Sequence, residues 1–328
     1  MKTGSRALLH ALAGLLIGTA ATLPSLAAGA EYPSRPIQLI VPFSAGGQFD
    51  FLARLVAKAM SKDLKENIIV ENVSGGGGNI GGAKAAAAAP DGYTLLEYGG
   101  NFAIAKYLSP KLAYDPIADF EPVAAISIAP HVILASNTFP AKTFKDMVEY
   151  GKAHPQALSY GSPGVGTSMQ LTFEEIKEHF GFQAVHIPYR GGSNTLNDLA
   201  GGQVGLAIVA VAPALPFIQA GKIRALAVTG KQRAPSLPQV PTVAELGYTG
   251  FDSGSWAGIA VPKGTPVAIV NRLNKAVQSA LNDPQIQQQL HALSFTLLPG
   301  PPKQLQDLIH QEAARYKPII ERLHLSTK

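Results

Sequence analysis

The sequence predicts an α/β protein of two lobes that are joined by two crossing strands, and three observations lead to this prediction. Apolar, β-rich runs alternate with segments of helical spacing through most of the 328 residues. A long and nearly continuous apolar run at 123–136 divides this alternation into two blocks. A helix-rich tail follows a stretch rich in proline and glycine. Such alternation is typical of parallel sheets with helices on both faces.

The first block contains three predicted strands, at 36–43, 67–73 and 93–99, each bounded by turn residues. Apolar residues at helical spacing predict a helix at 49–62. An alanine-rich segment predicts a shorter helix, which Pro90 ends.

The second block begins with the run at 123–136, which Pro130 interrupts too strongly for a single helix, so we expect a strand that passes through a core. The alternation of strands and helices restarts at 143–154. A strand and turn are predicted at 157–164 and further strands at 182–189, 204–211 and 222–230, with helices at 167–181 and 193–202. The tail predicts helices at 265–283, 284–294 and 301–323, with proline at or near their first turns.

Two chain crossings are expected, near 126–132 and near 252–258, so that the second lobe is an insertion into the first. The predicted lobes are therefore 31–128 plus 256–328, and 129–255. Two lobes joined in this way form a hinged clamp. Ligands of such folds bind at the carboxyl ends of the strands, where loops from both lobes face each other.

The composition argues against several classes of function. Charged residues make up 15% of the chain and hydrophobic residues 46%, which is a globular composition. The net charge of +5 is not concentrated in any basic run, so no nucleic-acid partner is expected. The chain has no cysteine and its histidines show no metal-ligand spacing, so we predict no disulfide, no metal and no cofactor.

The N-terminus predicts a signal peptide at 1–30. Lys2 and Arg6 precede an apolar segment at 7–23, and small residues at 28–30 fit a cleavage site near Ala30. The alternative is a membrane anchor, but the apolar segment is short and is interrupted by His10. We therefore expect an exported protein of the periplasm.

The stretch "VPFSAGGQFD" at 41–50 is the first candidate site. It ends a strand, turns at Gly46 and Gly47, and opens a helix. The free N–H groups and the dipole of a helix N-terminus favour an anion, and glycine lets a ligand approach the backbone closely. The alternative is a plain strand-to-helix connection. Asp50 is expected to support the loop, because its charge would repel an anionic ligand.

Two more turns of this kind lie in the second lobe, at Ser162–Ser168 and at Tyr189–Ser193. Each has an alternative explanation as a helix cap only. Together with the first loop they predict two lobes that offer helix N-termini to one cleft. Such a cleft suits an anion with two acidic ends, or with one acidic and one neutral end.

The segment Gly76–Gly81 supports a rival interpretation. It satisfies the pattern G-x-G-x-x-G between a predicted strand and a predicted helix, and Glu97 follows at the distance of a ribose-binding carboxylate. A run of glycines meets this pattern by chance, however, and it follows the second strand rather than the first. No nucleophile elbow and no H-E-x-x-H motif is present, so we predict no enzyme.

Eight segments occur in the order that one known family shows, among them "YPSRPIQLIVPFSAGGQFDFLARLVA", "GGGGNIGGAKAAAAAPDGYTLL", "HIPYRGG" and "LPQVPTVAELGY". From about Tyr32 to the C-terminal helix the chain resembles the substrate-binding proteins of tripartite tricarboxylate transporters, often called the Bug family. The resemblance implies a type II-like periplasmic binding protein fold, or Venus flytrap. It also implies capture of a small carboxylate for membrane permease subunits, without catalysis. We expect the protein to be a monomer.

In this family the loops that match the three glycine-rich turns hold the carboxyl groups of the ligand, largely through backbone N–H groups, hydroxyls and water. The resemblance and the loops together predict a set of ligand-binding residues: Phe43, Ser44, Ala45, Gly46, Gly47, Gln48, Phe49, Ser162, Gly166, Thr167, Ser168, Tyr189, Gly191, Gly192, Ser193 and Val209.

The chain departs from the family pattern at a few positions. Many relatives carry acidic residues where this chain has Gly205 and Val209, and many carry a smaller residue where it has Phe49. Val209 is expected at a strand end near the cleft. These changes predict a more apolar pocket, and hence a ligand with a hydrophobic or aromatic body and one or two carboxylates.

Overall fold

The structure is a computed structural model that describes residues 32–109, 111–155, 157–322 and 324–325. The predicted signal peptide and its cleavage site lie outside the described residues. Pro33–Lys328 makes one compact unit.

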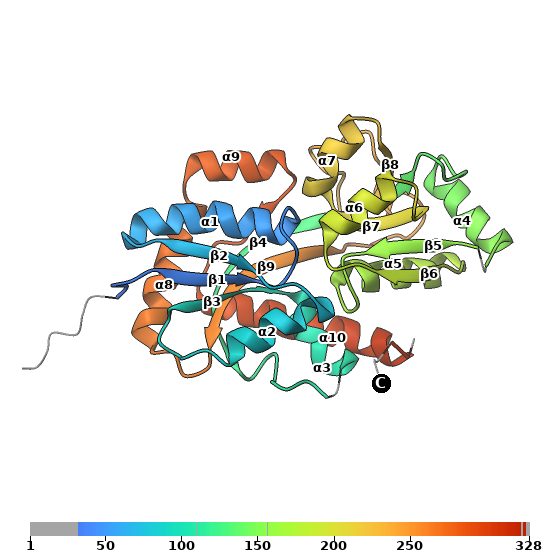
Figure 1. The fold of residues 1–328 in the computed structure, drawn as a ribbon. Coiled ribbons are helices and arrows are strands. Elements are labelled where there is room, and N and C mark those ends of the chain that lie inside the picture. Colours follow the sequence, from blue (N-terminus) through green and yellow to red (C-terminus); the bar gives the residue numbers. More distant parts are fainter. Residues whose placement is uncertain (1–31, 110, 156, 323, 326–328) are drawn as a thin grey trace, which may run out of the picture. The chain divides into compact units, whose positions relative to one another are not determined.

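The first half of the sheet is built from strands that are close in sequence and from one that returns late. β1 (Ile37–Val41) lies between β2 (Ile68–Asn72) and β3 (Thr94–Gly99), and all three are parallel. β9 (Gly254–Pro262) pairs antiparallel with β3. Figure 1 shows α1 on one side of these strands and α2, α3 and α10 on the other.

β4 (Phe120–Ser136) joins the two halves. Its first part pairs antiparallel with β9, and its second part pairs with β7 (Leu206–Ala210) and β8 (Ile223–Val228). The strands run in the order β2-β1-β3-β9-β4-β7-β5-β6, with β8 and β10 (Thr296–Leu297) also on β4. β5 (Ser159–Ser162) and β6 (Val185–Pro188) complete the second half. The long strand predicted at 123–136 is thus confirmed.

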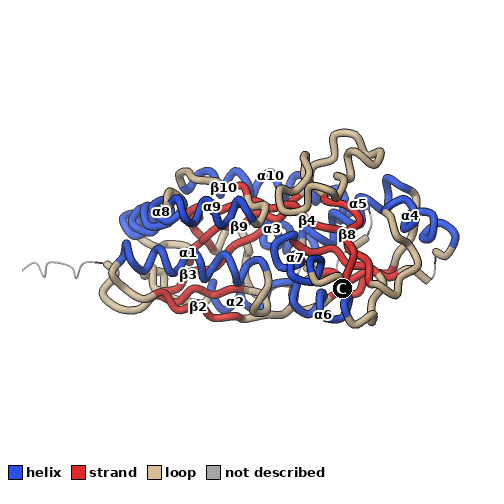
Figure 2. Tube along the Cα trace, turned by 90° about the horizontal axis from the view of Figure 1, so that it is seen from above, coloured by secondary structure: helices blue, strands red, loops and turns tan. Residues whose placement is uncertain are grey.

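Helices cover both faces of the sheet. Their bounds are α1 Gln48–Leu64, α2 Asn79–Ala86, α3 Gly100–Leu108, α4 Phe144–Ala153, α5 Ser168–Phe180, α6 Gly192–Ala200, α7 Val211–Gln219, α8 Val267–Leu281, α9 Pro284–Ala292 and α10 Pro302–Arg322. A 3₁₀ turn, η1 (Gly76–Gly78), precedes α2. In the second half, α6 and α7 lie on one face and α5 on the other (Figures 1 and 2).

Each half has its own hydrophobic core. Tyr98, Phe102 and Trp256 pack in the first half with residues of α2 and α10. The second half has one core towards α4 and α5 and another towards α6 and α7. A smaller cluster joins the halves, because α10 brings Tyr316 and Ile319 against Ile104 of α3 and Leu171 of α5. The C-terminal helix therefore packs on elements of both halves.

Two details of the predicted elements are wrong. The strand predicted at 204–211 ends at Ala210, and α7 begins at the next residue without an intervening loop. α3 follows β3 just as directly, in a segment for which we predicted no helix. The lobe boundaries at 128/129 and 255/256 stay a prediction, since both fall within continuous strands.

Candidate functional site

The loop between β1 and α1 is held in shape by Asp50. Its carboxylate accepts hydrogen bonds from the N–H of Gly46 at 2.9 Å, from Nε of Arg54 at 2.9 Å and from Nδ2 of Asn72 at 3.0 Å. Nδ2 of Asn72 also donates to the carbonyl of Phe43. Burial raises the pKa of Asp50, but these hydrogen bonds outweigh burial and hold the pKa below its ordinary value. These contacts agree with the supporting role that we predicted.

The loop presents an uncapped helix. Gly47 is the N-cap of α1 and, among the described residues, no side chain caps it. The φ angle of Gly46 is 78°, in the left-handed region that favours glycine. The first N–H groups of α1 are therefore available to a ligand.

Two aromatic rings flank this loop. Phe43 and Phe49 stack with ring centroids 4.8 Å apart and planes inclined by 15°. A Cβ atom on Gly99 would meet the ring of Phe49 at 3.3 Å, so the end of β3 packs against that ring. Both rings line the same small cavity, which gives one wall an apolar surface.

The loop between β5 and α5 is tied together by its own polar groups. Oγ of Ser162 lies 2.7 Å from Nε2 of His186. Burial lowers the pKa of His186 to about 4, so the ring is neutral at pH 7. Thr167 caps α5, since its Oγ1 accepts from the N–H of Gln170 and donates to the carbonyl of Gly164. His186 therefore helps to hold this loop through Ser162.

Oγ of Ser168 lies 3.0 Å from Oγ of Ser255 and 3.4 Å from Nε2 of His131. Ser255 and His131 belong to β9 and β4, the two strands that connect the halves. Ser168 is 6% exposed. Its hydroxyl is therefore occupied by the connecting strands, which the sequence did not indicate.

The loop at Tyr189–Ser193 touches the first loop directly. Oγ of Ser193 donates to the carbonyl of Ala45 at 2.7 Å. A Cβ atom on Gly191 would lie 2.2 Å from Oγ of Ser44, so only glycine fits there. The N-cap of α6 is Gly191, and none of the described side chains caps this helix. The uncapped helices α1 and α6 thus begin on opposite sides of the contact between Ala45 and Ser193.

Two cavities lie along this contact. The smaller has a volume of about 20 Å³ and lies between the starts of α1 and α6. Its lining residues are Phe43, Gly47, Gln48, Phe49, Pro163, Met169, Gly192, Ala210 and Pro213. The larger, of about 430 Å³, lies between η1, α3 and the loop after β5. It is lined by Gly166 and Tyr189 of the predicted set. Burial and a hydrogen bond with Asp198 raise the pKa of Tyr189 to about 12.

The sequence missed four of the residues that line the smaller cavity: Pro163, Met169, Ala210 and Pro213. Val209, which we predicted, does not line this cavity, whereas Ala210 does. Val209 is fully buried in the core towards α6 and α7, opposite Val132 in the register of β4. Successive side chains of a strand point to opposite faces, so Ala210 is the residue that faces the cavity.

The glycine motif at 76–81 does not form a dinucleotide site. Glu97, the proposed ribose ligand, is fully buried in β3. A Cβ atom on Gly77 would lie 2.2 Å from the carbonyl oxygen of Val165, so this loop meets the loop after β5 instead. In the part of the chain that the structure describes, no group of three or more His, Cys, Asp or Glu could hold a metal ion. No helix formed by the described residues is long and apolar enough to cross a membrane.

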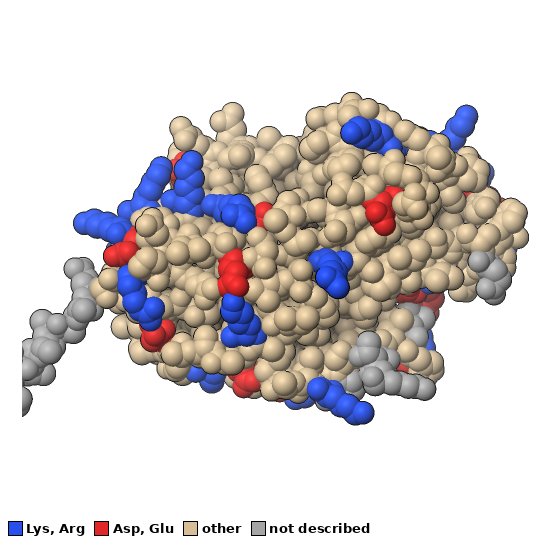
Figure 3. Space-filling view, in the orientation of Figure 1, with Lys and Arg blue, Asp and Glu red and all other residues tan. Residues whose placement is uncertain are grey.

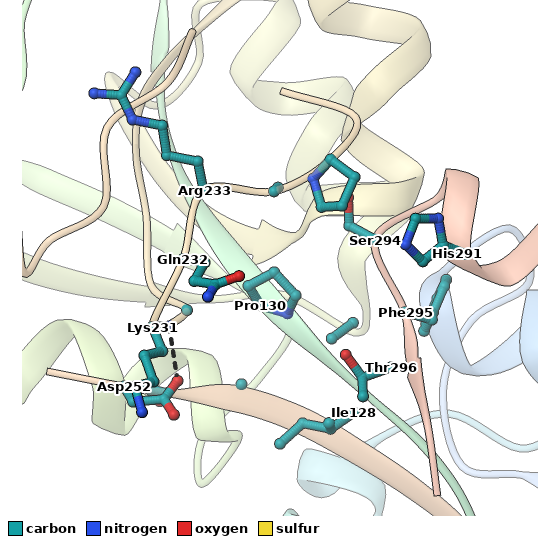
Figure 4. A pocket seen from close by; sticks show the side chains of 16 residues that line it. Ile128, Pro130, Lys231, Gln232, Arg233, Asp252, His291, Ser294, Phe295 and Thr296 are labelled. Carbon is teal, nitrogen blue, oxygen red and sulfur yellow. Dashed lines mark hydrogen bonds between the residues drawn. The ribbon is translucent and has the colours of Figure 1, made fainter. Parts of the chain in front are cut away.

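Another pocket, of about 380 Å³, lies where the halves are joined (Figure 4). Its walls come from β4 at Ile128–Pro130, from the loop at 230–235, from the start of β9 and from the turn after α9. Lys231 and Asp252 face each other there, and the N–H of Lys231 donates to Asp252. None of the predicted ligand-binding residues lines this pocket.

Basic and acidic side chains lie interspersed over the face shown in Figure 3. Among the described residues, neither kind lines the smaller cavity of the cleft. Uncapped helix N-termini and one buried amide are the polar groups that this cavity offers. The fold and the site together define a binding protein with a cleft between two α/β halves.

Comparison with known proteins agrees with this class. The family model described as tripartite tricarboxylate transporter family receptor matches residues 52–325. The structure of the periplasmic binding protein BugD is similar with a TM-score of 0.86 and 35% identity, over 90% of this chain and all of BugD. MatC of Rhodopseudomonas palustris with bound malate has a TM-score of 0.84 and 33% identity, over 88% of this chain and all of MatC. A protein of R. palustris with adipate has a TM-score of 0.85 and 33% identity, over 88% of this chain and 97% of its own.

The chain belongs to the receptor family of tripartite tricarboxylate transporters, and it has the periplasmic binding protein fold. This is a family of binding receptors and not of enzymes, so the dinucleotide enzyme considered from the sequence is excluded. The predictions of family, fold class and absence of catalysis are confirmed.

Proposed function

We propose that this protein captures a small carboxylate between the loops that follow β1, β5 and β6, and delivers it to the permease subunits of a tripartite tricarboxylate transporter. The observation that carries the proposal is the pair of uncapped helices, α1 and α6, which begin at one cavity. Their free N–H groups and aligned dipoles favour carboxylate oxygens. The adipate and malate complexes of the two relatives support this ligand class.

The lining of the cavity favours a ligand with a hydrophobic or aromatic body and one or two carboxylates. Apart from glycine backbone and Gln48, the lining side chains are those of phenylalanine, proline, methionine and alanine. Apolar surface of this kind stabilises an apolar body by about 25 cal/mol for each Å² removed from water. The present volume of about 20 Å³ leaves little room, so a ligand requires the halves to separate and close again.

The remaining parts of the proposal concern location and partners. We propose export by a signal peptide at 1–30 that is cleaved near Ala30, and action in the periplasm as a monomer without a nucleic-acid partner. The lobes at 31–128 plus 256–328 and at 129–255 would rotate about the connecting strands. The family to which the chain belongs supports the location and the transporter.

Native mass spectrometry of the protein purified from periplasm tests the function, followed by thermal unfolding with candidate ligands. Aromatic or apolar carboxylates should raise the melting temperature by several degrees, because a ligand at 100 times its Kd adds about 2.7 kcal/mol of stability. NAD should have no effect. Stabilisation by NAD and by no carboxylate would disprove the function, whereas stabilisation only by citrate or aspartate would disprove the apolar body.

A further inference from the structure

Gln48 is the one polar side chain among the described residues that line the smaller cavity. It is the first residue of α1 and is 4% exposed. Neither its Nε2 nor its Oε1 has a hydrogen-bond partner among the described residues. A buried polar group without a partner destabilises a fold, so an amide with both atoms unpaired in an apolar wall needs a function.

A second buried glutamine shows how a purely structural amide differs. Gln170 lies in the first turn of α5 and is also 4% exposed. Its Oε1 accepts from the N–H of Gly166 at 2.7 Å, which fixes the loop before α5. Gln48 makes no comparable contact to its own loop, where Asp50 already bonds to Gly46. The loop after β1 therefore keeps its shape without the amide of Gln48.

The chemistry of an amide limits which ligand can satisfy it. Nε2 donates two hydrogen bonds and Oε1 only accepts. A carboxylate only accepts, so it can pair with Nε2 but not with Oε1. The group that faces Gln48 must therefore also supply an O–H or N–H donor. None of the described residues that line the cavity is acidic, so a neutral donor fits better there than an ammonium group.

We propose that Gln48 is a specificity-determining residue, and that its amide selects a carboxylate with a hydroxyl group on a largely apolar body. The carboxylate lies at the starts of α1 and α6, the body lies against Phe43, Phe49 and Met169, and the hydroxyl donates to Oε1 of Gln48. This inference rests on the proposed function, because it describes the same cleft. The same acid without its hydroxyl would leave Oε1 buried and unpaired.

Calorimetric titration of the mature protein with matched acids tests the inference. Suitable pairs are 3-phenyllactate with 3-phenylpropionate, and mandelate with phenylacetate. Each hydroxy acid should bind about 10- to 100-fold more tightly than the acid without the hydroxyl group, because loss of that group leaves the buried Oε1 of Gln48 unpaired. The variant Gln48→Met keeps the volume and removes both polar atoms. It should abolish the preference, mainly by weakening the hydroxy acid, and should not lower the melting temperature.

The control variant is Gln170→Met, which removes a buried amide that has a structural partner. It should lower the melting temperature and weaken both acids of a pair to the same extent. The inference is wrong if the parent protein binds both acids equally, or if Gln48→Met keeps the preference, as it would if water satisfied the amide. If none of these acids binds while another carboxylate does, the inference fails alone. If no carboxylate binds, the proposed function fails as well, so the two failures are distinguishable.

Discussion

At the scale of single residues, Glu97 is a carboxyl group in an environment that is unusual for its chemical class. It is fully buried in β3, and neither carboxyl oxygen has a hydrogen-bond partner among the described residues. Burial, with a smaller contribution from the charge of Asp50, raises the pKa of Glu97 well above its ordinary value of 4.5. The folded protein therefore keeps this carboxyl protonated at a pH where the unfolded chain has lost the proton.

Replacing Glu97 by glutamine should stabilise the protein increasingly as the pH rises. Because the folded-state pKa is raised, the parent protein loses stability from about pH 4.5 upward until the folded carboxyl itself ionises. The amide of the variant has no proton to lose, so the difference in unfolding free energy between E97Q and the parent grows from pH 4 to pH 8. Urea unfolding at a series of pH values measures it. The exposed Glu149 provides the control E149Q, and a pH-independent difference for E97Q would contradict the buried neutral acid.

At the scale of elements, three helices that begin near the cleft differ in how their N-termini are capped. α1 and α6 start at glycines without a side-chain cap among the described residues, whereas Thr167 caps α5. Thr167 also bonds to Gly164, which lines the larger cavity. The uncapped starts offer N–H groups, and the capped start fixes the shape of its loop.

Thr167→Ala should lower the free energy of unfolding by about 1 kcal/mol, as expected for a lost N-cap. Because it also releases Gly164, it should weaken carboxylate binding by severalfold. Thr143→Ala is the matched control, since Thr143 caps α4 by a capping box with Asp146. It should lose the same stability and keep the affinity. Denaturant unfolding and calorimetric titration measure the two quantities, and equal affinities for both variants would mean that the loop before α5 does not contribute to binding.

The same elements show how far the sequence could predict the site. The turns at 43–49, 162–168 and 189–193 were predictable because glycine, a strand end and a helix start occur together in each. Which residue of β7 lines the cavity was not predictable from the sequence. All five residues of this strand are buried, so the pattern carries no alternation that separates Val209 from Ala210. α7 was missed because it starts where β7 ends, with no polar turn to mark the boundary. α3 was missed although Gly99, Gly100 and Asn101 mark a turn at its start, because we did not interpret the short apolar segment after them as a helix.

At the scale of the whole molecule, the two halves meet at backbone as well as at side chains. Gly77 of η1 lies so close to the loop after β5 that a Cβ atom would be 2.2 Å from the carbonyl oxygen of Val165. Ser193 and Ala45 make another contact between the halves, at 2.7 Å. We expect the carboxylate-bound protein to close around its ligand with these loops again in contact, so that the apparent Kd rises as the fraction of protein able to close falls.

Gly77→Ala should therefore weaken carboxylate binding by about tenfold or more, as the competent population falls by that factor. The matched control is Gly76→Ala. The φ angle is 59° at Gly76 and 65° at Gly77, so alanine carries a similar backbone penalty of about 1–2 kcal/mol at either position. A Cβ atom on Gly76 meets nothing nearer than 3.6 Å, so the halves can still close.

Calorimetric titration should show near-parental affinity for G76A and a loss of affinity for G77A. Small-angle scattering with saturating ligand should show a larger radius of gyration for G77A alone. Equal affinities for the two variants would mean that the bound protein does not bring Gly77 against Val165, and that closure is set at Ser193 and Ala45 instead.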